Sequence, residues 1–472
     1  MAFVRGDDRG QSTLFPLSLD ELVPAEHVCR VIEAFVRRLP LSGLGFGKAQ
    51  PKGTGRPPYD PADLLKLYLY GYLNQVRSSR RLERECQRNV EVMWLLGRLA
   101  PDHKTIAQFR RDNGKALQRA GAEFVRFCQG AGLVRGEWVA IDGSKFRAVA
   151  SGKAVVGLDE LSRQQAQRAQ RMAEYLDQLD AADVGEAEPA IDPAAVRQAL
   201  AVLADEQAAA AALAGTIEAE GRRHRVMTEP EARPLKGVGP GYNVQTAVDG
   251  AHALIVAHAV VTDAGDNRCL QPMAEAARDA LGATQLSVLA DTGYSNGSQA
   301  AALEAQGIEV HVPAHRSSNS HGGGGLFDRS AFAYDADQDV LRCPASRTLT
   351  RKQLMRKDHC VSYQADPRDC GACPLKPQCT VGSRRIVTRH LNEDALQRMQ
   401  ARATPEAMRR RRCTVEHPFG GLKYRIFEHP RFLLRGLAGA GTEIAIATLV
   451  WNLKRAMKVM GAGPLQARLA AG

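Results

Sequence analysis

The chain has 472 residues, more than the roughly 250 that a single core usually holds, so we expect one body with insertions or two domains. Hydrophobic residues make up 44% and charged residues 24%, a balance that excludes an intrinsically disordered protein. The formal net charge of +11 favours a polyanionic partner, although a basic enzyme from a GC-rich genome would have the same charge balance.

Neither a targeting segment nor a membrane span is predicted. Residues Met1 to Gln11 are polar and charged, without the apolar segment of a signal peptide. The apolar run Leu437 to Trp451 contains Glu443 and is shorter than the roughly 18 residues that cross a bilayer, so it is predicted to be a core helix. We therefore expect a cytoplasmic protein with no membrane partner.

Residues 14–135 are predicted to form an all-helical N-terminal domain that binds DNA. Asp60 before Pro61 is a typical helix start, and apolar residues then recur at helical spacing. Several short helices follow in close succession, as in helix-turn-helix modules. One of them is rich in arginine, which indicates either phosphate contacts or an ordinary solvated helix face. Its candidate phosphate contacts are Arg80 and Arg81, together with Arg77, Arg84 and Arg88.

Two aspartates each follow a short, mostly apolar strand. Trp138 to Ile141 precedes Asp142, and Gln285 to Ala290 precedes Asp291. If these strands are adjacent and parallel, their carboxyl ends would bring the two carboxylates together at one edge of the sheet. Taken singly, an aspartate after a strand is more often a turn or cap residue.

The strands around these aspartates predict an α/β fold. Tyr242 to Val248 and Ala253 to Val261 are separated by Asp249-Gly250, a hairpin signal. Strand, hairpin, helix, strand, helix, strand is the order expected of an RNase H-like mixed sheet. We assign this RNase H-like mixed-sheet catalytic core to residues 136–315 and 400–460.

Two insertions account for the rest of the chain. Residues 151–225 are rich in Ala, Gln, Glu and Arg with apolar positions at helical spacing, which predicts a helical insertion. Residues 316–400 form a Cys-rich insertion that is predicted to be loop-rich and has little apolar content.

The second insertion carries a metal-like cysteine pattern. Cys370, Cys373 and Cys379 form a C-x2-C-x5-C run, with Cys343 upstream as the fourth ligand, and this spacing is typical of tetrahedral structural zinc. Cys360 could replace Cys343. Buried or redox-inert thiols and an iron–sulfur cluster are the alternatives.

A third carboxylate, Glu416, lies on a predicted C-terminal helix that begins near Pro405. Arg412 precedes it by four residues and Lys423 follows it by seven, so a continuous helix would place all three on one face. A carboxylate between two cations suits a metal-bound phosphate, and a surface ion-pair ladder would show the same spacing.

This stretch resembles bacterial insertion-sequence transposases of the DDE class, in the branch with a cysteine-bearing insertion. Their last carboxylate lies in a Tyr-x2-Arg-x3-Glu-x6-Lys signature. Arg412, Glu416 and Lys423 occupy its last three positions, whereas Arg409 stands in the Tyr position, which leaves the role of Arg409 open. Further matching stretches are Asp102 to Arg110, Met227 to Arg233, Gly241 to Gln245, Ala290 to Tyr294 and Glu416 to Gly420.

The resemblance implies that Asp142, Asp291 and Glu416 hold two Mg²⁺ ions, which Mn²⁺ can replace. These ions would support cleavage of a DNA strand and its transfer to a target. The resemblance also implies that Arg412 and Lys423 neutralise phosphate charge, and Lys145 is a further candidate for that task.

The implied partner is double-stranded DNA, both the ends of an insertion sequence and its target. Synapsis of two ends implies a homodimer at least on DNA. Two rival functions remain open from the residues alone. One is a nuclease or resolvase that hydrolyses DNA without strand transfer, and the other is a decayed or domesticated copy that binds DNA as a regulator.

Overall fold

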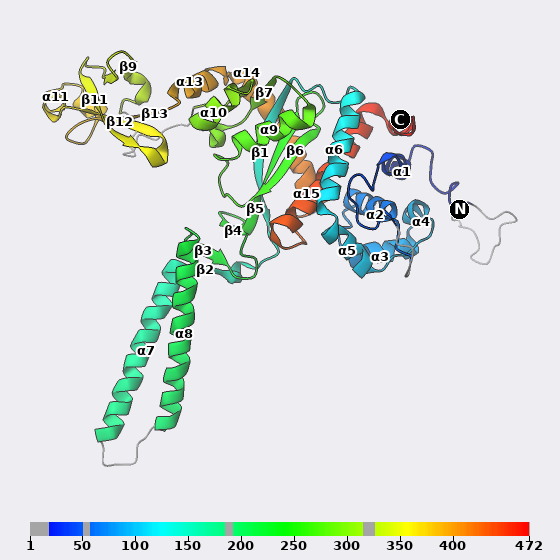
Figure 1. The fold of residues 1–472 in the computed structure, drawn as a ribbon, viewed down its shortest axis with the longest axis horizontal. Helices are drawn as coiled ribbons and strands as arrows, with labels where there is room; N and C mark the ends of the chain where they lie inside the picture. The colour runs from blue at the N-terminus through cyan, green and yellow to red at the C-terminus, as the bar shows by residue number, and fades with distance from the viewer. Residues whose placement is uncertain (1–17, 51–56, 185–191, 315–325, 472) are drawn as a thin grey trace, which may run out of the picture.

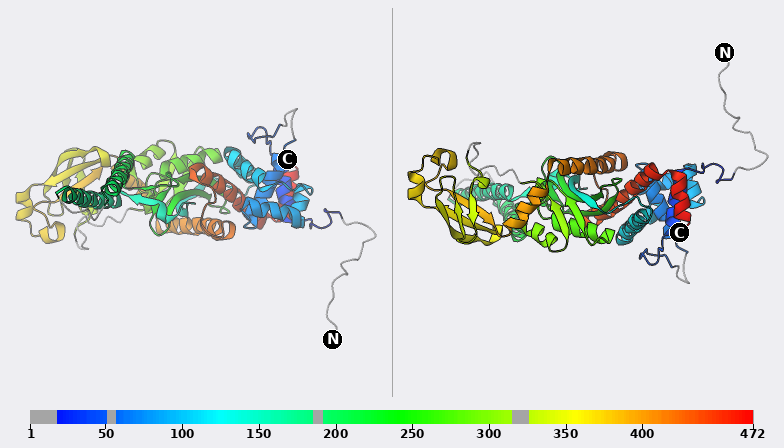
Figure 2. Two further views of the ribbon diagram at one scale, coloured as in Figure 1. Left: turned by 90° about the horizontal axis from the view of Figure 1, so that it is seen from below. Right: turned by 90° about the horizontal axis from the view of Figure 1, so that it is seen from above.

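The computed structural model describes residues 18–50, 57–184, 192–314 and 326–471. The molecule is elongated, with N-terminal helices at one end, a mixed sheet in the middle and a second sheet at the other end (Figures 1 and 2). A long helical hairpin projects from the middle (Figure 1).

The N-terminal region is helical, as predicted. Asp60 caps the second helix, its Oδ1 accepting a hydrogen bond of 2.8 Å from the amide of Ala62, and Asp102 caps the fifth by accepting one of 2.7 Å from Thr105. The helices described in this region are α1 (Val28–Arg38), α2 (Pro61–Leu73), α3 (Ser79–Arg88), α4 (Val90–Leu96), α5 (His103–Asp112) and α6 (Gly114–Gly130).

The C-terminal helices join this region to the sheet. The predicted core helix is α15 (Gly436–Met460), and it packs against α2, α6 and β6 (Ile255–Val261). The final helix, α16 (Ala462–Ala470), packs against α1. One continuous hydrophobic core therefore runs from the N-terminal helices into the central sheet.

The central sheet is mixed. β1 (Trp138–Arg147) pairs antiparallel with β5 (Gly239–Asp249) and parallel with β7 (Leu286–Leu289). β7 continues in parallel to β8 (Ile308–His311), while β6 and the short β4 (Arg233–Leu235) pair antiparallel with β5. Helices α9 (Leu270–Leu281), α10 (Gly297–Glu304), α13 (Glu393–Arg402) and α14 (Pro405–Gly420) complete this part of the molecule. The predicted mixed α/β sheet is thus confirmed.

β1 is longer than predicted. The predicted strand ends at Ile141, whereas β1 continues through Asp142 and Gly143 to Arg147. The cause is tertiary, because the long partner β5 supplies cross-strand positions for every residue from Val139 to Arg147. Asp142 therefore lies within a strand rather than in the loop that follows it.

The first insertion is the projecting helical hairpin. It consists of α7 (Leu158–Val184) and α8 (Pro193–Ala219), which pack against each other and extend away from the short pair β2 (Val155–Gly157) and β3 (His224–Val226). Among the described residues, one helix is long and apolar enough to cross a membrane, namely the segment Ala194–Ala219 of α8, whose most apolar stretch is 11% buried in the protein. Only the length and composition of this segment suggest a membrane span, and core helices of soluble proteins share both properties.

The second insertion is more regular than the predicted loop-rich segment. Its antiparallel sheet has the order β13-β12-β11-β10-β9 and its own small hydrophobic cluster. The prediction was wrong because exposed positions dominate β11, the longest strand of this sheet, so the apolar alternation that marks a strand is weak there. The elements are β9 (Ala333–Asp335), β10 (Val340–Arg342), β11 (Thr348–Met355), β12 (Cys360–Ala365), β13 (Ile386–His390), α11 (Pro367–Gly371) and α12 (Lys376–Cys379).

Candidate active site

Asp142 and Asp291 occupy equivalent positions on neighbouring parallel strands. The pairing of β1 with β7 places Ala140 opposite Leu289, and each aspartate lies two residues further along its own chain. Side chains two residues apart on a strand point to the same face, so this register directs both carboxylates to one place. The convergence expected from the sequence is present.

Arg411 of α14 joins the two carboxylates. Its Nη2 lies 2.7 Å from Asp142 Oδ1 and 3.3 Å from Asp291 Oδ2. Helix α14 contacts β1, β5 and β7, and this packing holds the guanidinium above the paired strands. The Arg411 side chain is 12% exposed, so the bridge is largely shielded from solvent.

Asp142 is the more buried of the two aspartates. Burial raises the pKa of its carboxyl to about 6, and the nearby carboxylates of Asp291 and Asp266 add to this rise. The cation of Arg411 and the amide of Gly143, which donates a hydrogen bond of 3.0 Å to Asp142 Oδ1, oppose it. The site therefore concentrates negative charge in a partly dry environment, which favours a bound cation.

Asp291 also has a local structural task. It precedes the short 3₁₀ turn Thr292–Tyr294, and its Oδ1 accepts a hydrogen bond of 2.8 Å from the amide of Gly293. The cap interpretation considered for this aspartate is therefore true as well. Its other oxygen, Oδ2, faces Arg411 and remains available to a shared cation.

Glu416 is not drawn into this pair. It is exposed on α14, five residues after Arg411. Among the described residues, no hydrogen bond or ion pair joins Glu416 to Asp142 or Asp291, and these three do not form a compact group of metal-ligand atoms. The structure thus brings two of the three predicted carboxylates together and leaves the third on the helix that covers them.

The predicted face of Arg412, Glu416 and Lys423 does not continue as one α-helix. Helix α14 ends at Gly420, and the turn Gly421–Ile426 is π-helical, which changes the angular spacing before Lys423. Arg412 is exposed.

Lys423 lies half-buried with its Nζ 5.7 Å from the ring centre of Phe146. Burial lowers the pKa of Lys423, and the carboxylate of Asp142 counteracts this, so the lysine lies near the aspartate pair. Its predicted role in neutralising phosphate charge stays a prediction.

Lys145 differs from the expectation. Because β1 continues past Asp142, a side chain three residues later points to the opposite face of the sheet. Lys145 lies there opposite Asn243 of β5. It is therefore directed away from the face on which Arg411 meets Asp142.

The arginines of the N-terminal region divide into two groups. Arg80 and Arg81 are exposed on α3, where a polyanion can reach them. Arg77 is buried and forms an ion pair of 3.0 Å with Glu443, so its assignment as a phosphate contact was wrong. Its guanidinium also stacks 4.3 Å from the ring centre of Phe427, a contact that a run of arginines in the sequence does not reveal.

Sequence reasoning missed a hydrogen-bond network behind the site that converges on Asp266. Asn243 Nδ2 and Gln245 Nε2 donate to Asp266 Oδ1 at 2.8 and 2.6 Å, and the Tyr294 hydroxyl donates to Gln245 Oε1. A Cβ at Gly143 would lie 2.4 Å from Asp266 Oδ1, so the glycine permits this close approach. Two of the matching stretches, Gly241 to Gln245 and Ala290 to Tyr294, supply these donors and were the available signal.

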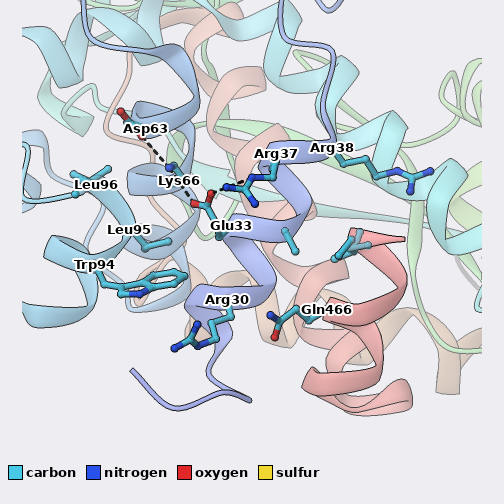
Figure 3. Close-up of a pocket in the computed structure, with 14 residues that line it drawn as sticks. Arg30, Glu33, Arg37, Arg38, Asp63, Lys66, Trp94, Leu95, Leu96 and Gln466 are labelled. Carbon is cyan, nitrogen blue, oxygen red and sulfur yellow. Dashed lines mark hydrogen bonds and ion pairs between the residues drawn. The ribbon is translucent and has the colours of Figure 1, made fainter. Parts of the chain in front are cut away.

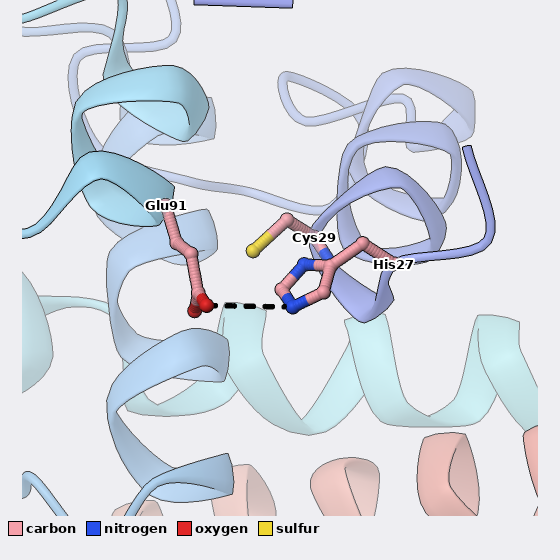
Figure 4. Close-up of side chains that lie close together, drawn as sticks. All are labelled: His27, Cys29 and Glu91. Atoms are coloured by element: carbon pink, nitrogen blue, oxygen red, sulfur yellow. Dashed lines mark hydrogen bonds and ion pairs between the residues drawn. The ribbon is translucent and has the colours of Figure 1, made fainter. Parts of the chain in front are cut away.

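Among the described residues, one group of possible metal ligands has all its ligand atoms within 4.8 Å of one another. It consists of His27, Cys29 and Glu91 (Figure 4). His27 Nδ1 caps α1 by accepting from the Cys29 amide, and Glu91 binds His27 at 3.4 Å and the Tyr70 hydroxyl at 2.7 Å. Burial raises the pKa of Cys29 to about 12, so its thiol stays protonated. The contacts of this group are those of a structural link between α1 and α4.

A polar hollow lies nearby between α1, α2, α4 and α16 (Figure 3). Lys66 at its wall forms ion pairs with Asp63 at 2.8 Å and Glu33 at 3.0 Å. Arg30 is held by Asp20 at 3.0 Å and stacks against Trp94. These charges are satisfied within the protein, and the hollow lies in the N-terminal helical region rather than beside Asp142 and Asp291.

Comparison with protein families gives two matches. Residues 17–112 match the family described as Transposase domain (DUF772), and residues 342–457 match the family described as Transposase DDE domain. The second match includes Arg411, Glu416 and Lys423. Searches of curated proteins and of solved structures give no significant match. The chain therefore carries a transposase domain in its N-terminal region and a transposase DDE domain toward its C-terminus.

Proposed function

We propose that this transposase cleaves DNA strands at the ends of an insertion sequence and joins them to target DNA. The observation that carries the proposal is the matched register of Asp142 and Asp291, which places two carboxylates around a single cationic nitrogen of Arg411. The RNase H-like core that we propose agrees with this arrangement, since its carboxylates project from adjacent central strands.

The donors fit a divalent metal. Oxygen ligands of carboxylates are those that Mg²⁺ prefers, and Arg411 shows that a positive group is stabilised between these two aspartates. Two Mg²⁺ ions, or Mn²⁺ in their place, would be held by Asp142, Asp291 and Glu416. When bound, the metals would activate the attacking oxygen and stabilise the leaving one.

For Glu416 to join the aspartates as a metal ligand, Arg411 would have to give up its place between them. Arg411 could then contact a phosphate oxygen of the DNA. Glu416, on the same helix, would have to approach the aspartates. The π-helical turn Gly421–Ile426 directly after α14 gives the helix a point at which such a shift can be absorbed.

The chemistry consists of two displacements at phosphorus. In the first, water attacks a phosphodiester, the P–O3′ bond breaks, and the products are a 3′-hydroxyl and a 5′-phosphate, with the proton of water passing to the departing oxygen through solvent. In the second, the freed 3′-hydroxyl attacks a target phosphodiester, and a target 3′-hydroxyl leaves. Lys423 beside Asp142, and Arg412 on the exposed face of α14, neutralise the phosphate charge.

DNA recognition is assigned to the N-terminal helices. Arg80 and Arg81 on α3 are exposed, so they can meet the phosphates of the element ends. Two ends must be held together for transfer, so we propose a homodimer on DNA. We further propose that the protein acts in the cytoplasm with α8 as half of a water-exposed hairpin rather than as a membrane span.

A strand-transfer assay separates this proposal from a nuclease or a DNA-binding regulator. The substrate is duplex DNA that carries the terminal sequences flanking the gene, with supercoiled plasmid as target and Mg²⁺ or Mn²⁺ in the buffer. Joined products support the transposase. Cleavage without joining would indicate a nuclease, and binding without cleavage would indicate a regulator.

A further inference from the structure

The cysteine-bearing insertion contains a small hollow lined by four thiols. Cys343 follows β10, Cys370 lies in α11, Cys373 follows α11, and Cys379 ends α12. All four line the same hollow, together with the buried Leu349 and other residues of the insertion. Cysteines that lie up to 36 residues apart in the sequence thus line one hollow.

The chain around Cys343 is shaped to stabilise a thiolate. The Arg347 amide donates a hydrogen bond of 3.3 Å to Cys343 Sγ, and the turn is closed by the Cys343 amide to Arg347 O at 2.9 Å. Ser346 supports the turn with a φ of 58°, in the left-handed region. A neutral thiol is a weak acceptor, whereas a metal-bound thiolate gains from such an amide donor.

A partly buried positive charge beside the hollow also favours a metal–thiolate site. Arg385 lines the hollow, and its Nε is buried without a hydrogen-bond partner among the described residues. A partly buried guanidinium at this wall suits a site in which metal-bound thiolates carry negative charge.

The insertion also needs a disulfide or metal cross-link to stabilise it. Its own hydrophobic cluster has seven buried residues and is separate from the main core, and Cys343, Cys370 and Cys379 pack against it. Units below roughly 70 residues seldom bury enough apolar surface without disulfides or a structural metal. Cys343, Cys370, Cys373 and Cys379 form no disulfide in the structure, so a metal rather than a disulfide would supply the link.

The structure also separates Cys343 from Cys360. Cys360 lies on β12, paired in register with Met355 and His390, and it is not among the residues that line the hollow. We propose that Cys343, Cys370, Cys373 and Cys379 bind one structural Zn²⁺ as a closed tetrahedral site that holds the insertion together. This site is remote from Asp142 in the fold, so it is independent of the proposed catalysis.

The experiment uses the full chain purified under reducing conditions. Elemental analysis should give about one zinc per chain, and exchange with Co²⁺ should give the visible absorption of a tetrahedral thiolate site. Cys373→Ser and Cys379→Ser should each lower the zinc content at least about tenfold. Cys360→Ser and Cys413→Ser are the matched controls and should retain it.

Each outcome decides the matter. Wild-type protein without metal and without a cobalt spectrum would overturn the proposal, even if the serine variants fail to fold. Iron with sulfide in place of zinc would overturn it as well. Loss of zinc in Cys360→Ser equal to that in Cys373→Ser would show that the ligand set is wrong. None of these measurements depends on DNA cleavage, so failure of the zinc site and failure of the transposase proposal remain distinguishable.

Discussion

Arg411 and Asp142 form the central ion pair of the candidate site, with Arg411 Nη2 only 2.7 Å from Asp142 Oδ1, and the same nitrogen also reaches Asp291. The pair is mostly shielded, because the two side chains are 12% and 22% exposed. A cation is thus a structural requirement of the metal-free site.

Replacing Arg411 with Gln should therefore destabilise the metal-free protein and increase its response to metal. Two close carboxylates would lose their counter-ion, at a cost of about 1–3 kcal/mol. Added Mn²⁺ should restore most of this, so the rise in Tm on adding Mn²⁺ should be larger than for the wild type. Thermal unfolding with and without Mn²⁺ measures both effects. Arg412→Gln is the matched control, and equal behaviour of the two variants would contradict the bridging role.

Cation binding should depend on pH through Asp142. The pKa of Asp142 is raised to about 6, so the folded, metal-free protein binds this proton more tightly than the unfolded chain does. Stability from this group is therefore present below the unfolded value of 3.8 and is lost as pH rises through about 6. Metal binding needs the ionised form and has the opposite dependence. The Mn²⁺-induced rise in Tm should be present above about pH 6 and disappear below it, and a pH-independent rise would contradict this assignment.

Asp266 should tune that transition without being needed for folding. In Asp266→Asn an oxygen remains to accept from Asn243 and Gln245, whereas one like charge near Asp142 is removed. The midpoint of the pH dependence should move to lower pH by roughly a few tenths of a unit. Asp263→Asn, at an exposed neighbouring position, should leave the midpoint unchanged. A midpoint that is also unchanged in Asp266→Asn would show that this carboxylate does not act on the site.

The buried Glu443 should be a major determinant of stability. It is fully buried, forms an ion pair with Arg77, and accepts hydrogen bonds from the amides of Leu433 and Leu434 at 2.6 and 2.7 Å. Glu443→Ala would leave Arg77 buried without its partner, so unfolding free energy should fall by about 3–5 kcal/mol. Chemical denaturation of the variant measures the loss. The exposed Glu406→Ala on α14 should change stability by less than about 0.5 kcal/mol, and a similarly small effect at position 443 would contradict the proposed role.

Local patterns in the sequence were sufficient for part of this architecture. Asp60-Pro61 predicted a helix start, and the apolar residues before Asp291 predicted a strand, because caps and burial are encoded by neighbouring residues. The length of β1, in contrast, is not determined by neighbouring residues in the sequence. Gly143-Ser-Lys145 resembles a turn, and only the long partner β5 keeps it extended.

The meeting of Asp142 and Asp291 was predicted from the apolar residues that precede each aspartate. The site residues whose position depends on tertiary packing were missed. Counting helical positions from Glu416 selected Arg412, whereas the packing of α14 on the sheet turns Arg411 toward the aspartates. Asp266 could not be found from its own neighbours, because its hydrogen-bond donors come from β5, 21 and 23 residues away in sequence. The π-helical turn that contains Lys423 likewise follows from packing rather than from helical periodicity.

The most direct test of the central claim is metal-dependent cleavage and joining of element-end DNA by Asp142→Asn, Asp291→Asn and Glu416→Gln, with Glu406→Gln on the same helix as control. We expect the first three variants to bind the DNA as the wild type does and to lose cleavage by roughly 1000-fold or more, while the control remains active. Wild-type rates of cleavage in Asp142→Asn or Asp291→Asn would contradict the account, because the site would then lie elsewhere.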